Sequence, residues 1–190
     1  LVRGADGVLE RMHRGYRADD YRRLVERIRR RLPQVSIATD IIVGFPGETE
    51  TEFLHTFDLL SELRLDVAHL ARYSARPGTV ADRRMVDDVP EAEKERRFRA
   101  LEDLQTAIGS EINARWVGRE VEVLVEDRVR ERWKGRTRTN KRVFFDADGD
   151  LRGRSETDRI EWAGPWRMVG APADTASSLP LSLAVASPAA

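Results

Sequence analysis

Thr39-Asp-Ile-Ile-Val-Gly-Phe-Pro-Gly-Glu-Thr49 is the stretch of sequence that decides the fold of the first half of this chain. Its three consecutive β-branched residues predict a strand that is buried on both faces. Gly44, Pro46 and Gly47 end that strand at once, as turn residues do. Thr49, with a glutamate three residues later, forms a capping box that begins a helix. Strand, glycine turn and helix in this order indicate one unit of a parallel α/β fold.

The glycine turn is also a candidate binding site. It follows the carboxyl end of the predicted strand, where parallel α/β folds bind their ligands, and Gly44 and Gly47 would let the backbone approach a ligand closely. The alternative is a plain connection, because many such turns carry glycine and bind nothing. The turn is neither a P-loop nor a dinucleotide fingerprint, because it lacks both Gly-Lys-Ser/Thr and Gly-x-Gly.

Composition narrows the class of protein. The chain has 190 residues, with 33 Lys plus Arg balanced by 33 Asp plus Glu, so any basic surface must be local. The sequence has no apolar run near 18 residues and its start does not resemble a signal peptide. We therefore expect a cytoplasmic protein with no membrane partner.

Cysteine is absent, which excludes disulfides and thiolate-bound zinc or iron–sulfur centres within this chain. The three histidines, His13, His55 and His69, fit no metal-ligand spacing, so no metal ligands are predicted. The chain lacks an initiator Met and starts in mid-pattern, which suggests a fragment.

Helix and strand periods alternate through the first half of the chain. Helices are expected over 5–13, 18–31 and 50–63, and strands over 36–43 and 67–73. An acidic connector over 80–89 leads to Pro90, which fits the first position of a helix that reaches about residue 115. That helix is long enough to brace two domains.

The period changes at Gly118. Val121, Val123 and Val125 alternate with polar residues, which predicts a half-buried strand. Further short strands are expected over 133–139, 142–145, 159–162 and 166–169, a spacing typical of a small barrel of the OB type. The expected domains are an α/β domain over 1–89, a bracing helix over 90–116, a barrel over 117–170 and a disordered tail over 171–190.

A local basic patch lies within residues 128–142, which hold eight Lys or Arg and one Glu. Trp133 lies inside the patch, and Phe144 and Phe145 follow it. Cations interleaved with aromatic rings suit a nucleic-acid surface, because cations meet phosphates and rings stack on bases. The alternative is a solvated barrel face with paired charges; the lack of neighbouring acids favours RNA binding.

Three motifs in this order resemble the MiaB-type methylthiotransferases, which are radical S-adenosylmethionine (SAM) enzymes. They are Thr39–Thr49, Tyr73-Ser-Ala-Arg-Pro-Gly-Thr79 and Gly135-Arg-Thr-Arg-Thr-Asn-Lys141. The resemblance covers about residues 1–170. It implies the C-terminal half of a radical SAM (β/α) barrel followed by a TRAM domain, a small all-β OB-like barrel that binds tRNA.

The resemblance implies a reaction for the parent enzyme, a transferase. One 4Fe-4S cluster cleaves SAM to a 5′-deoxyadenosyl radical, which abstracts hydrogen from C2 of N6-isopentenyladenosine at adenosine 37 of tRNA. A second 4Fe-4S cluster supplies sulfur, and a second SAM supplies the methyl group. The cluster ligands are missing here, so we expect this chain to be inactive alone. A partner chain could supply the missing N-terminal half, and an RNA-binding module without catalysis is the alternative.

The resemblance also assigns residues. Ile41, Val43 and Gly44 would line the SAM adenosine, with Tyr73 and Ser74 near the same site. Seven residues are assigned to the anticodon stem-loop of tRNA: Lys134, Arg136, Arg138, Thr139, Asn140, Lys141 and Arg142.

Three further expectations concern single positions. Glu48 is interpreted as an acid at a helix N-terminus rather than a catalytic base. Arg17 stands where the family usually has a Thr helix cap. Ser155-Glu-Thr-Asp158 falls where an apolar barrel strand is expected, so we expect that strand to be short or irregular.

Overall fold

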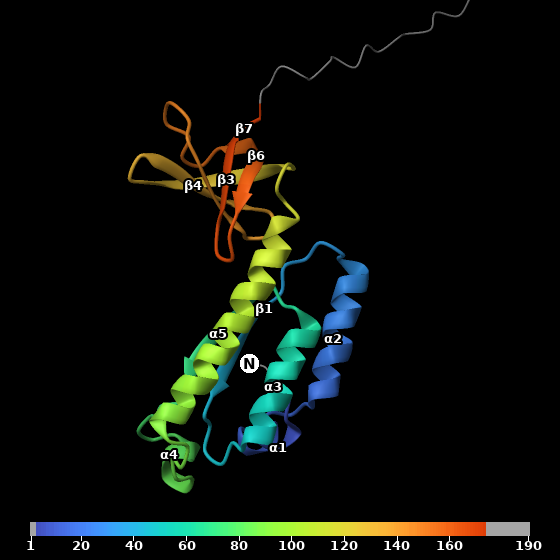
Figure 1. Ribbon diagram of the computed structural model, residues 1–190, viewed down its shortest axis with the longest axis vertical. Helices are drawn as coiled ribbons and strands as arrows, with labels where there is room; N and C mark the ends of the chain where they lie inside the picture. The colour runs from blue at the N-terminus through green and yellow to red at the C-terminus, as the bar shows by residue number, and fades with distance from the viewer. Residues whose placement is uncertain (1–2, 174–190) are drawn as a thin grey trace, which may run out of the picture.

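The computed structural model describes residues 3–173, which form two units stacked along the long axis of the molecule (Figure 1). The first unit is α/β and the second is a small closed barrel. The first unit has five helices and two strands in the described part of the chain: α1 Asp6–Arg11, α2 Ala18–Arg31, β1 Ala38–Val43, α3 Glu50–Leu63, β2 Val67–Arg72, α4 Val80–Arg84 and α5 Glu91–Ala114.

The predicted parallel pairing is confirmed. β1 and β2 form a two-stranded parallel sheet in which Ile41 lies opposite Leu70. The predicted capping box begins α3: Thr49 Oγ1 accepts a hydrogen bond from the Glu52 amide at 3.3 Å, and Glu52 Oε2 accepts one from the Thr49 amide at 3.0 Å. The local sequence signal at this turn therefore gave the correct helix start.

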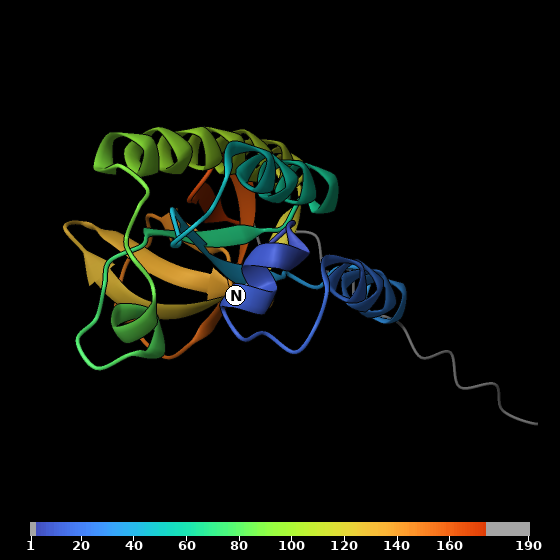
Figure 2. The ribbon, with the colours of Figure 1, turned by 90° about the horizontal axis from the view of Figure 1, so that it is seen from below.

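Only one face of this sheet is covered by helices α3 and α5 (Figure 2). The side chains of Ile41 and Val43 are fully buried against that layer, together with Phe53 of α3. On the other face Asp40 and its β2 partner His69 are exposed. The prediction that β1 is buried on both faces is therefore wrong for the described residues, because just one layer of helices covers these two strands.

The second unit is a closed barrel of five strands in the order β3-β4-β5-β7-β6, with β6 pairing back to β3. All pairs are antiparallel except β5 with β7. The predicted set of five strands is thus confirmed, with these bounds: β3 Glu120–Val129, β4 Arg132–Thr137, β5 Arg142–Phe145, β6 Ser155–Ala163 and β7 Met168–Pro172.

Several local predictions need correction. The expected connector over 80–89 contains the short helix α4, whose start is capped by Thr79 Oγ1 accepting from the Asp82 amide at 3.2 Å. Pro90 is the N-cap of α5 rather than its first residue. β6 runs unbroken through Ser155–Asp158 and is nine residues long; its irregularity is a register shift between Ile160 and Trp162.

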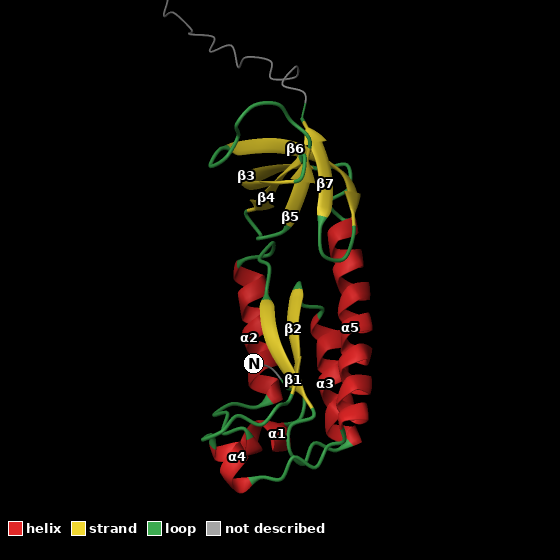
Figure 3. Cartoon of the chain, turned by 90° about the vertical axis from the view of Figure 1, so that its left-hand side faces the viewer, coloured by secondary structure: helices red, strands yellow, loops and turns green. Residues whose placement is uncertain are grey.

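Helix α5 connects the two units (Figure 3). It packs on α3 and β2, and near its end the Asn113 side-chain amide donates to the backbone oxygens of Gly164 and Pro165 at 2.8 and 3.1 Å. A second link joins Lys141 Nζ of the barrel to Asp66 Oδ1 at 2.9 Å. These contacts fix the barrel on the α/β unit, and the predicted division of the chain into domains stays a prediction.

Within residues 3–173 no helix is long and apolar enough to cross a membrane. The predicted tail over 171–190 lies outside the described residues from 174 onward. Its start, to Pro172, belongs to β7.

Candidate nucleic-acid interface between the barrel and the α/β unit

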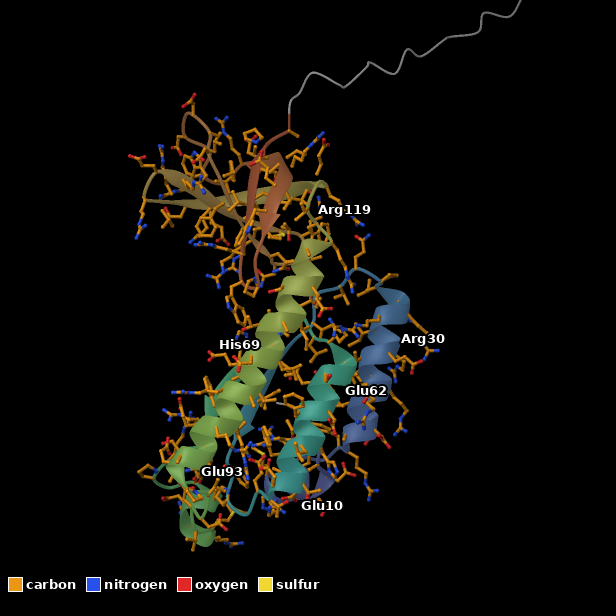
Figure 4. All side chains as sticks on the ribbon, viewed as in Figure 1. Glu10, Arg30, Glu62, His69, Glu93 and Arg119 are labelled. Atoms are coloured by element: carbon orange, nitrogen blue, oxygen red, sulfur yellow. The ribbon has the colours of Figure 1, made fainter. Side chains whose placement is uncertain are left out.

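A cleft of about 350 Å³ lies where the barrel meets the amino ends of β1 and β2. The α/β unit contributes Ala38, Val67 and His69 to its walls. In Figure 4, Arg119 lies where α5 leads into the barrel. The barrel contributes a basic wall with one exposed aromatic ring: Arg136, Arg138, Asn140, Lys141, Arg142, Trp166 and Arg167.

Three of the predicted RNA-binding cations have acidic partners. Arg136 Nε lies 2.9 Å from Glu126 Oε1, and Arg138 Nε lies 2.6 Å from Glu122 Oε2. Both carboxylates come from β3, which pairs with β4. The prediction that this patch lacks compensating acids is therefore wrong: the acids are distant in sequence but adjacent in the sheet.

Lys141 differs from the other predicted cations because it is nearly enclosed. Its side chain and that of Asp66 are each 11% exposed, and they form an ion pair between the two units. The second Asp66 oxygen accepts from the Ile37 amide at 3.0 Å. The structure thus gives Lys141 a structural contact, and its assignment to RNA stays a prediction.

Lys134, Arg142 and Arg167 are among the barrel cations that have no ion pair within the part of the chain that the structure describes. Arg142 is exposed and lies opposite Arg136 across β4 and β5. The guanidinium carbon of Arg167 lies 5.9 Å from the centre of the Phe144 ring. These side chains can meet phosphates without first leaving a carboxylate partner.

The Thr-Arg-Thr-Asn segment forms the turn between β4 and β5. Asn140 has a φ of 61°, a left-handed conformation that Asn tolerates. Its Oδ1 accepts from Arg136 Nη1 at 2.8 Å, and the hydroxyls of Thr137 and Thr139 lie 3.0 Å apart. These polar groups therefore hold the turn in shape, and the proposed contacts of Thr139 and Asn140 with RNA would be made from that fixed turn.

The aromatic residues of the patch are not where the sequence suggested. Trp133 and Phe145 are 4% and 1% exposed in the barrel core, and Trp133 Nε1 donates to the Ala147 oxygen at 3.2 Å. Their inward direction follows from strand alternation. The ring that does line the cleft is Trp166, which is 47% exposed and was not predicted as a site residue. Its position directly after the Gly164-Pro165 turn is the signal that could have found it.

The predicted SAM-contacting residues lie at the opposite, carboxyl edge of the sheet. The side chains of Ile41 and Val43 point into the core, so only their backbone faces that edge. Tyr73 packs edge to face against Phe45, with ring centres 5.2 Å apart, and Ser74 is exposed. These residues therefore come together at one edge, but mainly through packing contacts.

Gly44 is enclosed by this chain's own groups. It has a φ of 69°, and its amide donates to Glu48 Oε2 at 2.6 Å. A side chain on Gly44 would overlap Lys94, which is itself buried and bonded to Asp87 at 2.7 Å. Gly44 is therefore needed for the close approach of α5 to the turn.

Glu48 belongs to a buried ion-pair cluster, so its interpretation as a helix N-terminal acid is incomplete. Its carboxylate bonds Arg3 and also lies 3.1 Å from Arg97 Nη1. All three side chains are at most 5% exposed. The cluster fastens the start of the chain, the glycine turn and α5 together.

The two predicted sites lie at opposite ends of the strands (Figure 3). β1 has six residues, which span about 20 Å at about 3.3 Å per residue. Within residues 3–173 no group of three or more His, Cys, Asp or Glu side chains is arranged to hold a metal ion.

No family model matches this chain. It is 46% identical over 172 residues to tRNA-2-methylthio-N(6)-dimethylallyladenosine synthase of Chloroflexus aurantiacus, covering 89% of this chain and 37% of that protein. It is 45% identical over 165 residues to the protein of the same name from Dehalococcoides mccartyi, covering 87% of this chain and 40% of the relative. The same-named protein of Herpetosiphon aurantiacus is 45% identical over 170 residues, covering 88% and 39%.

The fold and the cleft define an α/β protein that carries a small closed barrel with a basic wall. The comparisons then show that this chain is a homologue of MiaB-type tRNA methylthiotransferases and matches a C-terminal part of them. It spans about 37–40% of the length of the relatives named above.

Proposed function

We propose that this chain is the tRNA-holding, C-terminal portion of a methylthiotransferase that acts at C2 of N6-isopentenyladenosine in the anticodon loop. One observation carries the proposal: identity of 45–46% runs through both units and covers 87–89% of the chain. The first unit is then part of a radical SAM barrel, and the second is a TRAM domain.

The barrel supplies the RNA surface in this proposal. Arg142 and Arg167 lie on the basic wall of the cleft, and Lys134 lies nearby on β4. Because these three cations have no carboxylate partner in residues 3–173, a phosphate can approach them without breaking an ion pair. Arg136 and Arg138 are paired at exposed positions, where an ion pair is worth little and exchanges readily for a phosphate.

Catalysis needs groups that this chain does not contain. It has no cysteine, so it cannot ligate the clusters that the family resemblance implies. The turn at Gly44 is closed by Glu48 and Lys94, and SAM would have to be held from the side of Tyr73 and Ser74. We propose that the chain alone is inactive.

RNA binding tests the proposal directly. Fluorescence anisotropy with a labelled anticodon stem-loop should give an affinity that falls with salt, with a slope of log K against log[salt] of about −2 for three phosphate contacts. Arg142→Ala should lower that slope by about 0.7. The matched control is Arg99→Ala on the exposed face of α5, which should leave the slope unchanged. No binding, or a flat salt dependence, would contradict the proposal.

The iron–sulfur cluster content of the purified chain tests the proposal that the chain alone is inactive. After anaerobic reconstitution with iron and sulfide, the purified chain should retain no stoichiometric iron. Two bound clusters per chain would overturn that part and leave the RNA-binding proposal standing. The alternative, an RNA-binding module whose biological role involves no methylthiolation, is favoured by the absence of cysteine. It predicts binding without preference for the isopentenyl group.

A further inference from the structure

Trp166 occupies the tip of the connection between β6 and β7, on the wall of the cleft. We propose that its indole ring is a stacking platform for one unpaired base of the bound RNA. This inference rests on the proposed function. It names the residue by which this surface would bind looped RNA in preference to duplex RNA. A large ring that is 47% exposed among arginines has the chemistry that a nucleotide base recognises.

The tip that carries Trp166 is held rigidly on α5. The Asn113 side chain donates to the backbone oxygens of Gly164 and Pro165, the two residues just before the ring. Gly109 lies one turn earlier on α5, and a side chain there would come within 2.8 Å of the Pro165 oxygen. The close contact that Gly109 permits therefore fixes the backbone before the ring, so little conformational entropy is lost when a base stacks on it.

Cations flank the ring on the barrel side. Met168 pairs with Val143 in the parallel ladder of β7 and β5, so the preceding residues, Arg167 and Arg142, lie side by side. Neither has a carboxylate partner within residues 3–173. One aromatic face next to two available guanidinium groups matches a base together with its flanking phosphates.

Trp162 provides a matched comparison. It is 49% exposed, close to the value for Trp166, and it lies on β6 of the same hairpin. It is not among the residues that line the cleft, and its ring lies over Gly164, where a Cβ would overlap it. Removing Trp162 therefore removes a similar ring from the same hairpin at a position that does not line the cleft.

The experiment compares three variants of the chain, each first shown to unfold at a temperature near that of the wild type. The probe is a 17-nucleotide anticodon stem-loop with 2-aminopurine in the loop. Trp166→Ala should weaken binding by about 5- to 160-fold, the loss expected for one stacked base. Trp166→Phe should stay within about 3-fold, and Trp162→Ala within about 2-fold.

A blunt RNA duplex separates stacking from a merely structural role. Because all bases of a long duplex except those at its two ends are stacked on one another, they are not available to a side chain, and Trp166→Ala should bind a long duplex as wild type does. Equal loss for loop and duplex, or no loss for either, overturns the stacking inference and leaves the proposed function intact. If wild type binds neither RNA, the proposed function itself fails, and the inference fails with it.

Discussion

Asp158 lies inside the barrel with 0% exposure, and neither carboxylate oxygen has a hydrogen-bond partner among the described residues. Burial, with a smaller contribution from the charge of Glu156, raises its pKa from 3.8 to about 6. A carboxyl whose pKa is raised on folding stabilises the fold fully below its unfolded pKa, and the benefit is lost as pH rises through the folded value. The relevant window is therefore about pH 4 to 6.

Asp158→Asn should remove this pH dependence. Relative to wild type, the variant should gain up to about 3 kcal/mol of unfolding free energy between pH 3.5 and pH 7.5, because two pKa units correspond to about that energy. Urea unfolding of both proteins at the two pH values measures this gain in unfolding free energy. Subtracting the wild-type value from that of the variant removes the contribution of the other carboxylates, which both proteins share. An unchanged difference across that range would show that Asp158 ionises freely in the fold.

Glu48 illustrates the opposite case, a buried carboxylate with partners. Glu48→Gln leaves Arg3 and Arg97 without their shared counter-charge and should destabilise the chain by about 3–5 kcal/mol. The control is Glu62→Gln, whose partner Arg22 is on the surface, with an expected change within about 0.5 kcal/mol. Thermal and urea unfolding measure the loss of stability in both variants. Equal losses for Glu48→Gln and Glu62→Gln would contradict the stabilising role of the buried cluster.

At the scale of elements, α2 shows how a missing cap is replaced. Arg17 cannot accept hydrogen bonds as a Thr cap would, yet Asp20 accepts from the Arg17 amide and Asp6 from the Ala18 amide, each at 2.9 Å. The cost expected from losing the cap is therefore offset by two acids. The Asp20 bond is local and could be foreseen from sequence, whereas the Asp6 bond depends on how α1 packs.

In helix α5, one substitution sets the cost of tertiary packing against the gain in helix propensity. Gly109→Ala should stabilise an isolated helix by about 1 kcal/mol. Here the new Cβ would sit 2.8 Å from the Pro165 oxygen, so we expect a net loss of about 1–3 kcal/mol as the hairpin is displaced. Thermal unfolding measures the change.

The matched control is Ala107→Gly, on the exposed side of the same helix, which should cost about 0.5–1 kcal/mol from propensity alone. A more stable Gly109→Ala protein would mean that α5 and the hairpin of β6 and β7 do not touch in solution.

For the whole molecule, the ion pair between Lys141 and Asp66 is one of two links that hold the barrel on the α/β unit. Lys141→Ala would leave a nearly buried carboxylate without its cation and should cost about 1–3 kcal/mol. Lys134→Ala, on the outer face of the barrel, should change unfolding by less than about 0.5 kcal/mol. Thermal unfolding measures the stability of the Lys141→Ala and Lys134→Ala variants, and ¹⁵N relaxation measures the motion of the barrel in each of them.

RNA binding by the same pair of variants tests the sequence assignment. If Lys141 mainly fixes the barrel, Lys141→Ala should leave the salt slope near its wild-type value, whereas Lys134→Ala should lower it by about 0.7. A lower slope for Lys141→Ala with unchanged stability would favour the direct RNA contact instead.

Much of the fold followed from local sequence signals. The capping box at Thr49, the turn at Gly44 and the alternation at Val121, Val123 and Val125 each depend on residues a few positions apart, and all gave correct elements. The absence of cysteine alone excluded cluster ligation by this chain. Local periodicity and composition are properties that a chain carries before it folds.

Tertiary structure decided which predicted groups remain available. It placed Glu122 and Glu126 beside the basic strand, Asp66 against Lys141, and Trp133 inside the barrel, while exposing Trp166 at the cleft. Charge pairing and burial depend on residues that are far apart in sequence and meet only when sheets close and units dock. The sequence therefore determined the elements and the homology to known proteins, and the folded arrangement determined which side chains are exposed at the cleft where we propose that RNA binds.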